Sequence, residues 1–486
     1  MSVVEILLIV VYGIVILMLA LFGLHKYYLL YLFWKYRNRP AIEPGEFETP
    51  PRVTVQLPIY NEKYVVERLI KAVCNLEYPK DLLEIQVLDD STDETQQVTK
   101  NWTEAFRKQG FDIQYIHREK RTGFKAGALE EGLKKAKGEF IAIFDADFVP
   151  KPDYLKKTLP YFVHEKVGMV QVRWGHINQN YSLLTQIQSV FLDGHFVIEH
   201  TARNRSGRFF NFNGTAGIWR KQAIESAGGW QHDTLTEDLD LSYRAQLAGW
   251  KFVYLPDVVA PAELPVVMNA FKSQQYRWAK GSIQTAKKLL PKIFKSTLPL
   301  KVKWEAFVHL ISNFSYLLMA IPSIFILPVT IIQFNNEWTR FIYVYLFLFF
   351  SATVSVFLFY VVCQRALYPD WLQRLRYIPG MMAFGIALSI NNSKAVLEAF
   401  FNYRTDFKRT PKYRIESKRD LWKNKIYSAE KNFLPFLEFF LGIYFSFSVY
   451  FAVKNHVYFS IPFFLLFQFG FLYLSLMSLV QIKRRI

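Results

Sequence analysis

Acidic residues gather at the start of an apolar helical pattern in LTEDLDLSYRAQLAGWK, residues 235–251. Glu237, Asp238 and Asp240 fall within four positions, directly after Thr236. Carboxylates in a first turn are favoured by the helix macrodipole, and a threonine before them can act as an N-cap. The same carboxylates could instead supply a general base, which takes a proton from an attacking hydroxyl group. The segment alone leaves both interpretations open.

Further acidic residues follow short β-rich runs of the sequence. Glu62 follows the first run, Asp90 ends the second, and Asp145 and Asp147 follow the fourth. The carboxyl ends of parallel strands form one sheet edge, where carboxylates repel each other unless a cation or polar ligand lies between them. The D-x-D pair in FDADF can hold Mg²⁺ or Mn²⁺ through oxygen ligands. A solvated turn is the alternative for this pair.

The segment REKRTGFKAGAL, residues 118–129, has the features of a phosphate site. Gly123 and Gly127 open a helical pattern, and Arg118, Arg121 and Lys125 lie on the approach to it. A helix N-terminus with nearby basic side chains attracts phosphate groups. A basic, solvated helix face would have the same residues, so this segment alone does not decide between the two.

A second basic segment, SQQYRWAKG at residues 273–281, places Arg277 next to Trp278. The guanidinium group can bind a diphosphate, and the indole offers a flat apolar face that suits the C–H surface of a sugar ring. A helix on a membrane surface with an interfacial tryptophan is the alternative, because an apolar segment precedes it and a basic one follows. The two interpretations are compatible.

The elements that must position these residues form one α/β domain. β-rich runs alternate with helical patterns, which predicts a parallel sheet whose ligand crevice lies at the carboxyl ends of the strands. The predicted strands are residues 53–57, 84–90, 111–117, 139–145 and 168–174. No window between residues 41 and about 300 is apolar enough to cross a membrane.

The composition indicates a membrane protein. The chain has 486 residues, 51% of them apolar and 45 of them phenylalanine, yet its formal net charge is +18. Such a chain suits either nucleic acid or an anionic membrane surface. The basic residues flank apolar runs and no nucleic-acid motif occurs, so no nucleic-acid partner is predicted. Cys74 and Cys363 lack metal-ligand spacing and are expected to be reduced thiols.

Five apolar runs, one of them interrupted by Glu438, are long enough to cross a bilayer. They are residues 6–24, 306–336, 341–364, 432–453 and 457–480. Residues 377–393 are also uncharged, but a span there would place the segment 401–425, with nine Lys/Arg against three acids, outside the membrane. That arrangement violates the positive-inside rule, so we predict an interfacial or half-buried helix.

The charges around these runs predict the orientation of a multi-pass membrane protein. Basic residues follow the first run and do not precede it, which indicates an uncleaved anchor with the N-terminus outside. The domains expected are an anchor (1–40), a cytosolic domain (41–300) and a membrane region (301–486) with a loop-rich part at about 365–430. The protein is expected in the plasma or inner membrane, or in the Golgi of a eukaryote.

The order of the motifs is more specific than any one of them. Asp90, the Asp145–Asp147 pair, TED at 236–238 and QQYRW at 274–278 follow one another. This series resembles the D, DxD, TED and QxxRW residues of processive family-2 glycosyltransferases, which include the cellulose, chitin and hyaluronan synthases. It implies a Rossmann-like GT-A catalytic domain joined to a helical membrane region.

The similarity is closer to cellulose-synthase-like A and C proteins, which are the plant mannan and xyloglucan-backbone synthases, and to their bacterial relatives. It rests on FNGTAGIWR at 212–220, AGGW at 227–230, EDLDLSYRAQLAGWKF at 237–252 and the QQYRW sequence. FKRTPK at 407–412 is similar to the F-x-V-T-x-K gating loop of this family, from which Arg409 and Pro411 depart. The resemblance extends over essentially the whole chain.

The resemblance implies a role for each matching residue. Asp238 corresponds to the general base, and a helix N-terminus is expected to keep its carboxylate ionised near neutral pH. Metal binding falls to Asp145 and Asp147. Donor binding is implied for Glu62, Asp90, Lys125, Asp145, Gln274 and Arg277. Acceptor binding is implied for Trp278, Asn213, Gly214, Thr215 and Glu237. The gating loop would contain Phe407, Arg409, Thr410 and Lys412 as a lid over the donor.

These roles predict an inverting, metal-dependent membrane glycosyltransferase that uses Mg²⁺ or Mn²⁺. It would transfer a sugar from a nucleotide-sugar donor, GDP-mannose or UDP-glucose, to a growing β-linked glycan and pass the polymer across the bilayer. The alternative is transfer of one sugar to a membrane lipid, as in ceramide glucosyltransferases. A transporter without catalysis is disfavoured, because the spans contain few ionisable residues. The sequence does not reveal the oligomeric state.

Overall fold

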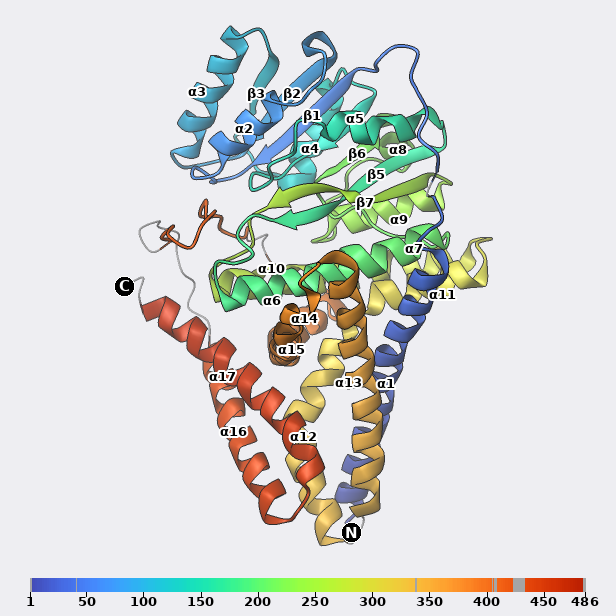
Figure 1. Cartoon of the computed structure of the whole chain (residues 1–486), viewed down its shortest axis with the longest axis vertical. Helices are drawn as coiled ribbons and strands as arrows, with labels where there is room; N and C mark the ends of the chain where they lie inside the picture. Colours follow the sequence, from blue (N-terminus) through green and yellow to red (C-terminus); the bar gives the residue numbers. More distant parts are fainter. Residues whose placement is uncertain are drawn as a thin grey trace.

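The computed structural model describes residues 2–40, 42–336, 339–403, 405, 409–422 and 433–483. An α/β domain forms one end of the molecule, and long helices extend from it toward the other end (Figure 1). The helices α6 (Leu183–Asp193) and α10 (Met268–Lys295) run across the boundary between the two parts. The two-part architecture expected from the sequence is therefore present.

The centre of the α/β domain is a seven-stranded sheet in the order β3-β2-β1-β4-β6-β5-β7. Its strands are β1 (Val53–Ile59), β2 (Leu83–Asp89), β3 (Asp112–His117), β4 (Phe140–Ile143), β5 (Val167–His176), β6 (Gly217–Arg220) and β7 (Lys251–Ala262). All five predicted strands are present, and β1 pairs in parallel with β2 and β4, as β2 does with β3.

The expectation of an all-parallel sheet is wrong at β6, which runs antiparallel to both β4 and β5. This strand has only four residues, GIWR, all of them buried, so it carries no alternating pattern. The last strand, β7, was also not predicted, and its two prolines, Pro256 and Pro261, interrupt the pattern typical of a strand. The sheet is therefore mixed.

Helices cover both faces of the sheet. They are α2 (Val66–Cys74), α3 (Thr95–Lys108), α4 (Phe124–Lys135), α5 (Tyr154–Thr158), α7 (Thr201–Arg205), α8 (Lys221–Ser226) and α9 (Glu237–Leu247). The central strands β2, β4 and β6 are buried throughout, and alternate residues of β1, namely Val53, Val55 and Leu57, belong to one apolar core. On the opposite face of β1, Gln56 Nε2 donates to Gln86 Oε1 at 3.0 Å, which pairs one polar atom of each buried amide.

Five helices in the described part of the chain are long and apolar enough to cross a membrane, as predicted. They are α1 (Val3–Tyr36), α12 (Phe314–Asn335), α13 (Thr339–Leu367), α16 (Leu434–Lys454) and α17 (Ile461–Lys483). Two predicted boundaries are wrong. α1 continues beyond residue 24 because its later turns pack against α7, and the run 306–336 is divided by a turn between α11 (Leu300–Ile311) and α12.

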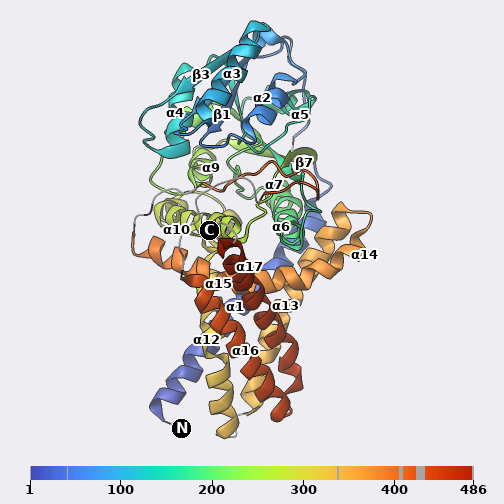
Figure 2. The ribbon, with the colours of Figure 1, turned by 90° about the vertical axis from the view of Figure 1, so that its left-hand side faces the viewer.

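The uncharged run at 377–393 forms α15 (Ile378–Phe400), which is not among those five helices. Figure 1 shows α15 end-on while α12 and α13 are seen along their lengths, so it lies across them. It packs against α10, α12 and α17. Figure 2 shows the same boundary from the side, with α10 and α15 between the α/β domain and the spanning helices.

Candidate active site

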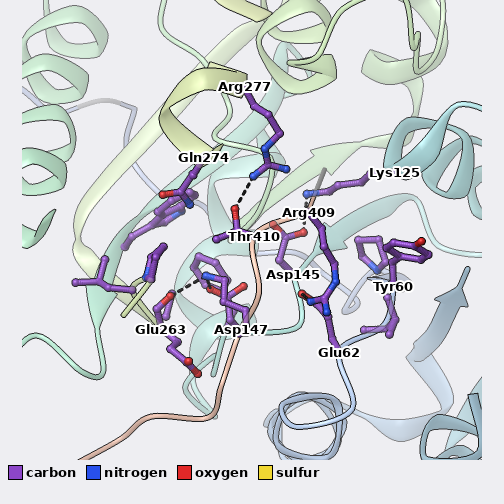
Figure 3. A pocket seen from close by; sticks show the side chains of 18 of the residues that line it. Tyr60, Glu62, Lys125, Asp145, Asp147, Glu263, Gln274, Arg277, Arg409 and Thr410 are labelled. Carbon is purple, nitrogen blue, oxygen red and sulfur yellow. Dashed lines mark hydrogen bonds and ion pairs between the residues drawn. The ribbon is translucent and has the colours of Figure 1, made fainter. Parts of the chain in front are cut away.

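A pocket lies at the carboxyl ends of β1, β2 and β4, against α10 (Figure 3). The predicted strand ends therefore meet as expected from a parallel arrangement. Ten of the predicted site residues line this pocket: Glu62, Asp90, Lys125, Asp145, Asp147, Gln274, Arg277, Arg409, Thr410 and Lys412.

The two aspartates of the D-x-D sequence follow β4 and each contact a lysine. Asp145 Oδ1 lies 2.5 Å from Lys125 Nζ, and Asp147 Oδ2 lies 2.5 Å from Lys412 Nζ. The backbone N–H of Asp145 donates to Thr215 Oγ1 at 2.9 Å, which anchors the turn. Burial raises the pKa of Asp145, and the nearby charge of Asp147 raises it further, against the opposing effect of Lys125. The negative charges of Asp145 and Asp147 therefore repel each other.

Glu62 brings a third carboxylate to the same pocket. Burial raises its pKa to about 7; Asp147 and Asp145 add to this rise and Arg409 opposes it. A divalent cation would relieve this repulsion, and carboxylate oxygens are the ligands that Mg²⁺ takes. In the part of the chain that the structure describes, no three His, Cys, Asp or Glu side chains converge as a metal cage. A cation held by one or two carboxylates and by phosphate oxygens fits these residues.

Asp238 lies in the first turn of α9 and is buried among charged groups. Its Oδ1 accepts a hydrogen bond from the backbone N–H of Leu239 at 2.8 Å. Burial raises the pKa of Asp238 to about 7, Glu237 raises it too, and Lys125 opposes both. The helix N-terminus therefore does not keep this carboxylate fully ionised near neutral pH, contrary to the expectation, because desolvation outweighs it. A carboxylate with this pKa suits proton transfer at neutral pH.

Thr236 precedes α9, but its side chain does not cap the helix. Its hydroxyl instead lies 3.3 Å from that of Thr285 in α10. Thr236 therefore occupies the expected N-cap position without a capping hydrogen bond, and its side chain joins α9 to α10.

The loop Asn213–Gly214–Thr215 borders Asp238. Gly214 has φ +80°, and a Cβ added there would lie 3.0 Å from Asp238 Oδ2 and 3.4 Å from Lys125 Nζ. Lys125 Nζ donates to the carbonyl oxygen of Gly214 at 2.8 Å. Lys125 thus joins the loop to Asp145. Burial alone would lower the pKa of Lys125, but Asp145 and Glu237 raise it, so this amine stays charged.

The helix α10 contributes Gln274 and Arg277 to the pocket, as predicted. Arg277 donates to Thr410 Oγ1 at 2.8 Å (Figure 3). Burial lowers the pKa of Arg277 to about 10, against the effects of Glu237 and Asp145, so it remains a cation at neutral pH. Trp278 is half-buried on the same helix and is not among the described residues that line the pocket.

Residues 409–412 lie within the pocket and contact its acidic groups. Arg409 lies 3.4 Å from Glu62 Oε1, and Lys412 donates to Asp147 Oδ2 and, at 2.7 Å, to the carbonyl oxygen of Glu263. The expected lid residues Arg409, Thr410 and Lys412 thus line the pocket. Phe407 lies outside the described residues.

Two features of the site were missed from the sequence. Glu263 follows β7, which was itself not predicted; its Oε1 accepts from the backbone N–H of Tyr413 at 2.8 Å. Tyr60 stacks on Arg121, whose guanidinium carbon lies 3.5 Å from the ring centroid. The rule that found Glu62, namely a polar residue at a strand end, would have found Glu263 if β7 had been recognised.

The segment predicted to bind phosphate does begin a helix, but its Arg118 pairs with a carboxylate of the protein. α4 begins at Phe124, directly after Gly123, which has φ +72°. Arg118 does not lie free for a phosphate: its Nε and one terminal nitrogen bind the two carboxylate oxygens of Asp90 at 2.7 and 2.5 Å. This bidentate pair fixes Asp90 at the pocket edge.

Residues 50–281 match the family model "Glycosyltransferase like family 2". The chain is 42% identical over 300 residues to glucomannan 4-beta-mannosyltransferase 2 of Arabidopsis thaliana, covering 59% of this chain and 56% of that protein. It is 44% identical over 269 residues to glucomannan 4-beta-mannosyltransferase 1 of Oryza sativa subsp. japonica, covering 54% and 51%. The chain thus spans about half the length of the curated relatives it matches.

Among solved structures, the mannosyltransferase PcManGT from Pyrobaculum calidifontis, in complex with GDP-Man and Mn²⁺, has a similar fold. Its TM-score is 0.52 at 18% identity, and the match covers 82% of this chain and 99% of that one. This match shows similarity of fold. Residues 50–281 therefore belong to glycosyltransferase family 2, and they have the GT-A fold.

Proposed function

We propose that this protein is an inverting, metal-dependent membrane glycosyltransferase that extends a β-linked polysaccharide from a nucleotide-sugar donor. The observation that carries the proposal is the position of Asp238, whose pKa is near 7, beside Lys125 and the loop at Gly214. The plant relatives are glucomannan 4-beta-mannosyltransferases, and the archaeal structure holds GDP-Man and Mn²⁺. GDP-mannose is therefore the first donor to test, and UDP-glucose the second.

In the proposed reaction, a hydroxyl group of the acceptor sugar attacks the anomeric carbon of the donor. Asp238 takes the hydroxyl proton on Oδ2, because Oδ1 already accepts from Leu239. The bond between the anomeric carbon and the diphosphate breaks as the new glycosidic bond forms, which inverts the configuration. The buried cations Arg277 and Lys125 then face the negative charge that develops on the diphosphate.

A divalent cation would be held by Asp145 and Asp147, and when bound it neutralises charge on the diphosphate. Asp147 Oδ2 contacts Lys412 in this structure, so the ammonium group compensates the same carboxylate. Lys412 must leave Asp147 before a cation can bind there. Residues 409–412 thus act as a lid that moves as the donor enters.

The remaining roles are part of the same proposal. Glu62 and Asp90, which line the pocket, would contact the nucleoside, and Gln274 would accompany Arg277 at the diphosphate. The acceptor would lie along Glu237, Trp278 and the loop from Asn213 to Thr215.

The catalytic domain is proposed to face the cytosol, where nucleotide sugars are made, and the spanning helices to carry the glycan outward. The curated relatives, which synthesise a polysaccharide by name, do not favour transfer of one sugar to a membrane lipid.

Asp238→Asn tests the proposal directly. The amide cannot accept the proton but preserves the shape of the side chain, so turnover should fall by about 10²–10⁴-fold while the Kd of the nucleotide stays within about twofold. Asp233→Asn is a matched control, because Asp233 is largely exposed and pairs only with Lys288 among the described residues. An Asp238→Asn variant that keeps substantial turnover would show that another group is the base.

A further inference from the structure

Two histidines bind the side-chain amide of Asn213, one residue from the loop position that borders Asp238. His200 Nε2 donates to Asn213 Oδ1 at 2.5 Å, and Asn213 Nδ2 donates to His195 Nε2 at 2.8 Å. The two imidazole centroids are 4.2 Å apart. Each imidazole nitrogen can donate or accept, so the tautomers of the two histidines set the orientation of the amide.

An unusual backbone brings these histidines together. Residues Gly194–His200 form η3, a π-helix of seven residues between α6 and α7. In an α-helix, side chains five positions apart point about 140° away from each other, so His195 and His200 could not both reach one amide. The wider π turn, with i→i+5 hydrogen bonds, aligns the two side chains. Such turns are rare in proteins, and many of those that occur lie at functional sites.

A partly buried ion network around Glu199 orients the ring of His195. His195 Nδ1 lies 3.3 Å from Glu199 Oε2 and donates to it, which leaves Nε2 as an acceptor for the amide. Burial alone would raise the pKa of Glu199, but Lys26 and Arg203 hold it well below its usual range. Lys26 Nζ lies 2.6 Å from Glu199 and belongs to α1, so the first spanning helix takes part in the network.

His200 is held as a neutral donor. It is fully buried, and burial together with the nearby His195 places its pKa well below its usual value. A neutral imidazole carries one proton, and the Asn213 oxygen can only accept, so that proton is on Nε2. The side chains therefore form one chain of hydrogen bonds with consistent donors and acceptors, from Glu199 through His195 and Asn213 to His200.

We infer that His195 and His200 are positioning residues for the transfer: by fixing Asn213 they hold the adjoining Gly214 against Asp238 and Lys125. The inference rests on the proposed function, because it assigns Asp238 as the base. Gly214 transmits this constraint to the site, since its carbonyl oxygen accepts from Lys125 and a Cβ built on it would lie only 3.0 Å from Asp238 Oδ2. Neither histidine reaches the acceptor itself in this account.

Steady-state kinetics of His200→Leu and His200→Gln test the inference. Leucine removes the donor, so kcat should fall by about 10–100-fold while the KM of the donor stays within about twofold, because only the acceptor wall shifts. Glutamine places an amide N–H near the position of Nε2 and should recover most of that loss. Asn213→Ala should lower kcat equally, and the His200→Leu/Asn213→Ala double variant should lose no more than either single variant.

His164→Leu is the matched control, because His164 is exposed and, among the described residues, its ring binds only the carbonyl oxygen of Glu43. Equal loss in the leucine and glutamine variants, additive losses in the double variant, or a loss confined to the donor KM would overturn the inference. If His200→Leu does not fold, an unchanged kcat in Asn213→Ala overturns it instead. These outcomes are distinguishable from an error in assigning Asp238 as the base, because only the Asp238→Asn variant tests that assignment.

Discussion

The pKa of Asp238 is the balance of opposing effects at one residue. Burial and the neighbouring Glu237 raise it to about 7, and Lys125 lowers it. Since a base must be ionised to accept a proton, activity should rise with pH through about 7 and be lost below it. Burial of a carboxyl group raises its pKa in this way because the charged form loses its hydration.

Glu237→Gln should shift the loss of activity at acidic pH to lower pH. Removing the negative charge next to Asp238 lowers the pKa of Asp238, so more of the base is ionised at a given acidic pH. The midpoint of log(kcat/KM) against pH is expected to shift below that of the parent protein. A midpoint that stays in place or rises would show that Glu237 does not act on the base electrostatically.

The structure brings the charged residues of the sequence motifs together at one pocket, whereas the histidines outside the motifs were not anticipated. Asp145, Lys125 and Arg277 were identified because charged types at strand ends and helix starts carry a physical meaning. His195 and His200 escaped notice because five-residue spacing has no meaning in an α-helix or a strand. Only the π-helix, which depends on tertiary packing, makes that spacing significant.

At the scale of elements, α10 connects the pocket to the spanning helices. Arg277 faces the pocket, and five residues earlier Lys272 Nζ lies 2.6 and 2.8 Å from the two carboxylate oxygens of Glu438 in α16. Both side chains are almost fully buried, with 3% and 0% of their surfaces exposed. A buried pair of this kind fixes relative position more than it stabilises, because both charges lost their hydration.

Lys272→Met should destabilise the protein by about 3–5 kcal/mol, because it leaves the Glu438 carboxylate buried without a counter-charge. The double variant Lys272→Met/Glu438→Leu should be close to the parent protein, since it removes both charges. Chemical unfolding of detergent-solubilised protein, followed by tryptophan fluorescence, measures these differences. A Lys272→Met variant as stable as the parent protein would mean that water reaches the Glu438 carboxylate.

The strands and helices with clear periodicity were predicted to within a few residues, whereas short or interrupted elements were not. β1 and β2 alternate apolar residues with polar ones, namely Thr54 and Gln56 in β1 and Glu84 and Gln86 in β2, which is the period of a strand. β6 is too short to show alternation, and the direction of a four-residue strand is decided by its neighbours in the sheet. The division of the run 306–336 into α11 and α12 was missed because both halves are apolar, so composition does not mark the turn.

At the scale of the whole molecule, α1 begins far from the α/β domain, and α17 ends near it (Figure 1). Five spans, an odd number, would place Ser2 on one side of the bilayer and the α/β domain on the other. The basic residues that follow α1 favour the cytosolic side for the domain.

Cysteine labelling tests this orientation. Ser2→Cys should react with a membrane-impermeant maleimide on intact cells, and Glu119→Cys should react only after the membrane is opened. The native Cys74 and Cys363 are buried, which keeps the background low. The reverse pattern of labelling would contradict the proposed topology.

The central claim is best tested with purified protein, a panel of radiolabelled nucleotide sugars and either Mn²⁺, Mg²⁺ or EDTA. The account predicts that one donor, GDP-mannose first and UDP-glucose second, labels a long chain that a β-glycanase digests, and that EDTA abolishes the label. A product confined to a small lipid-soluble molecule, or transfer undiminished by EDTA, would contradict it.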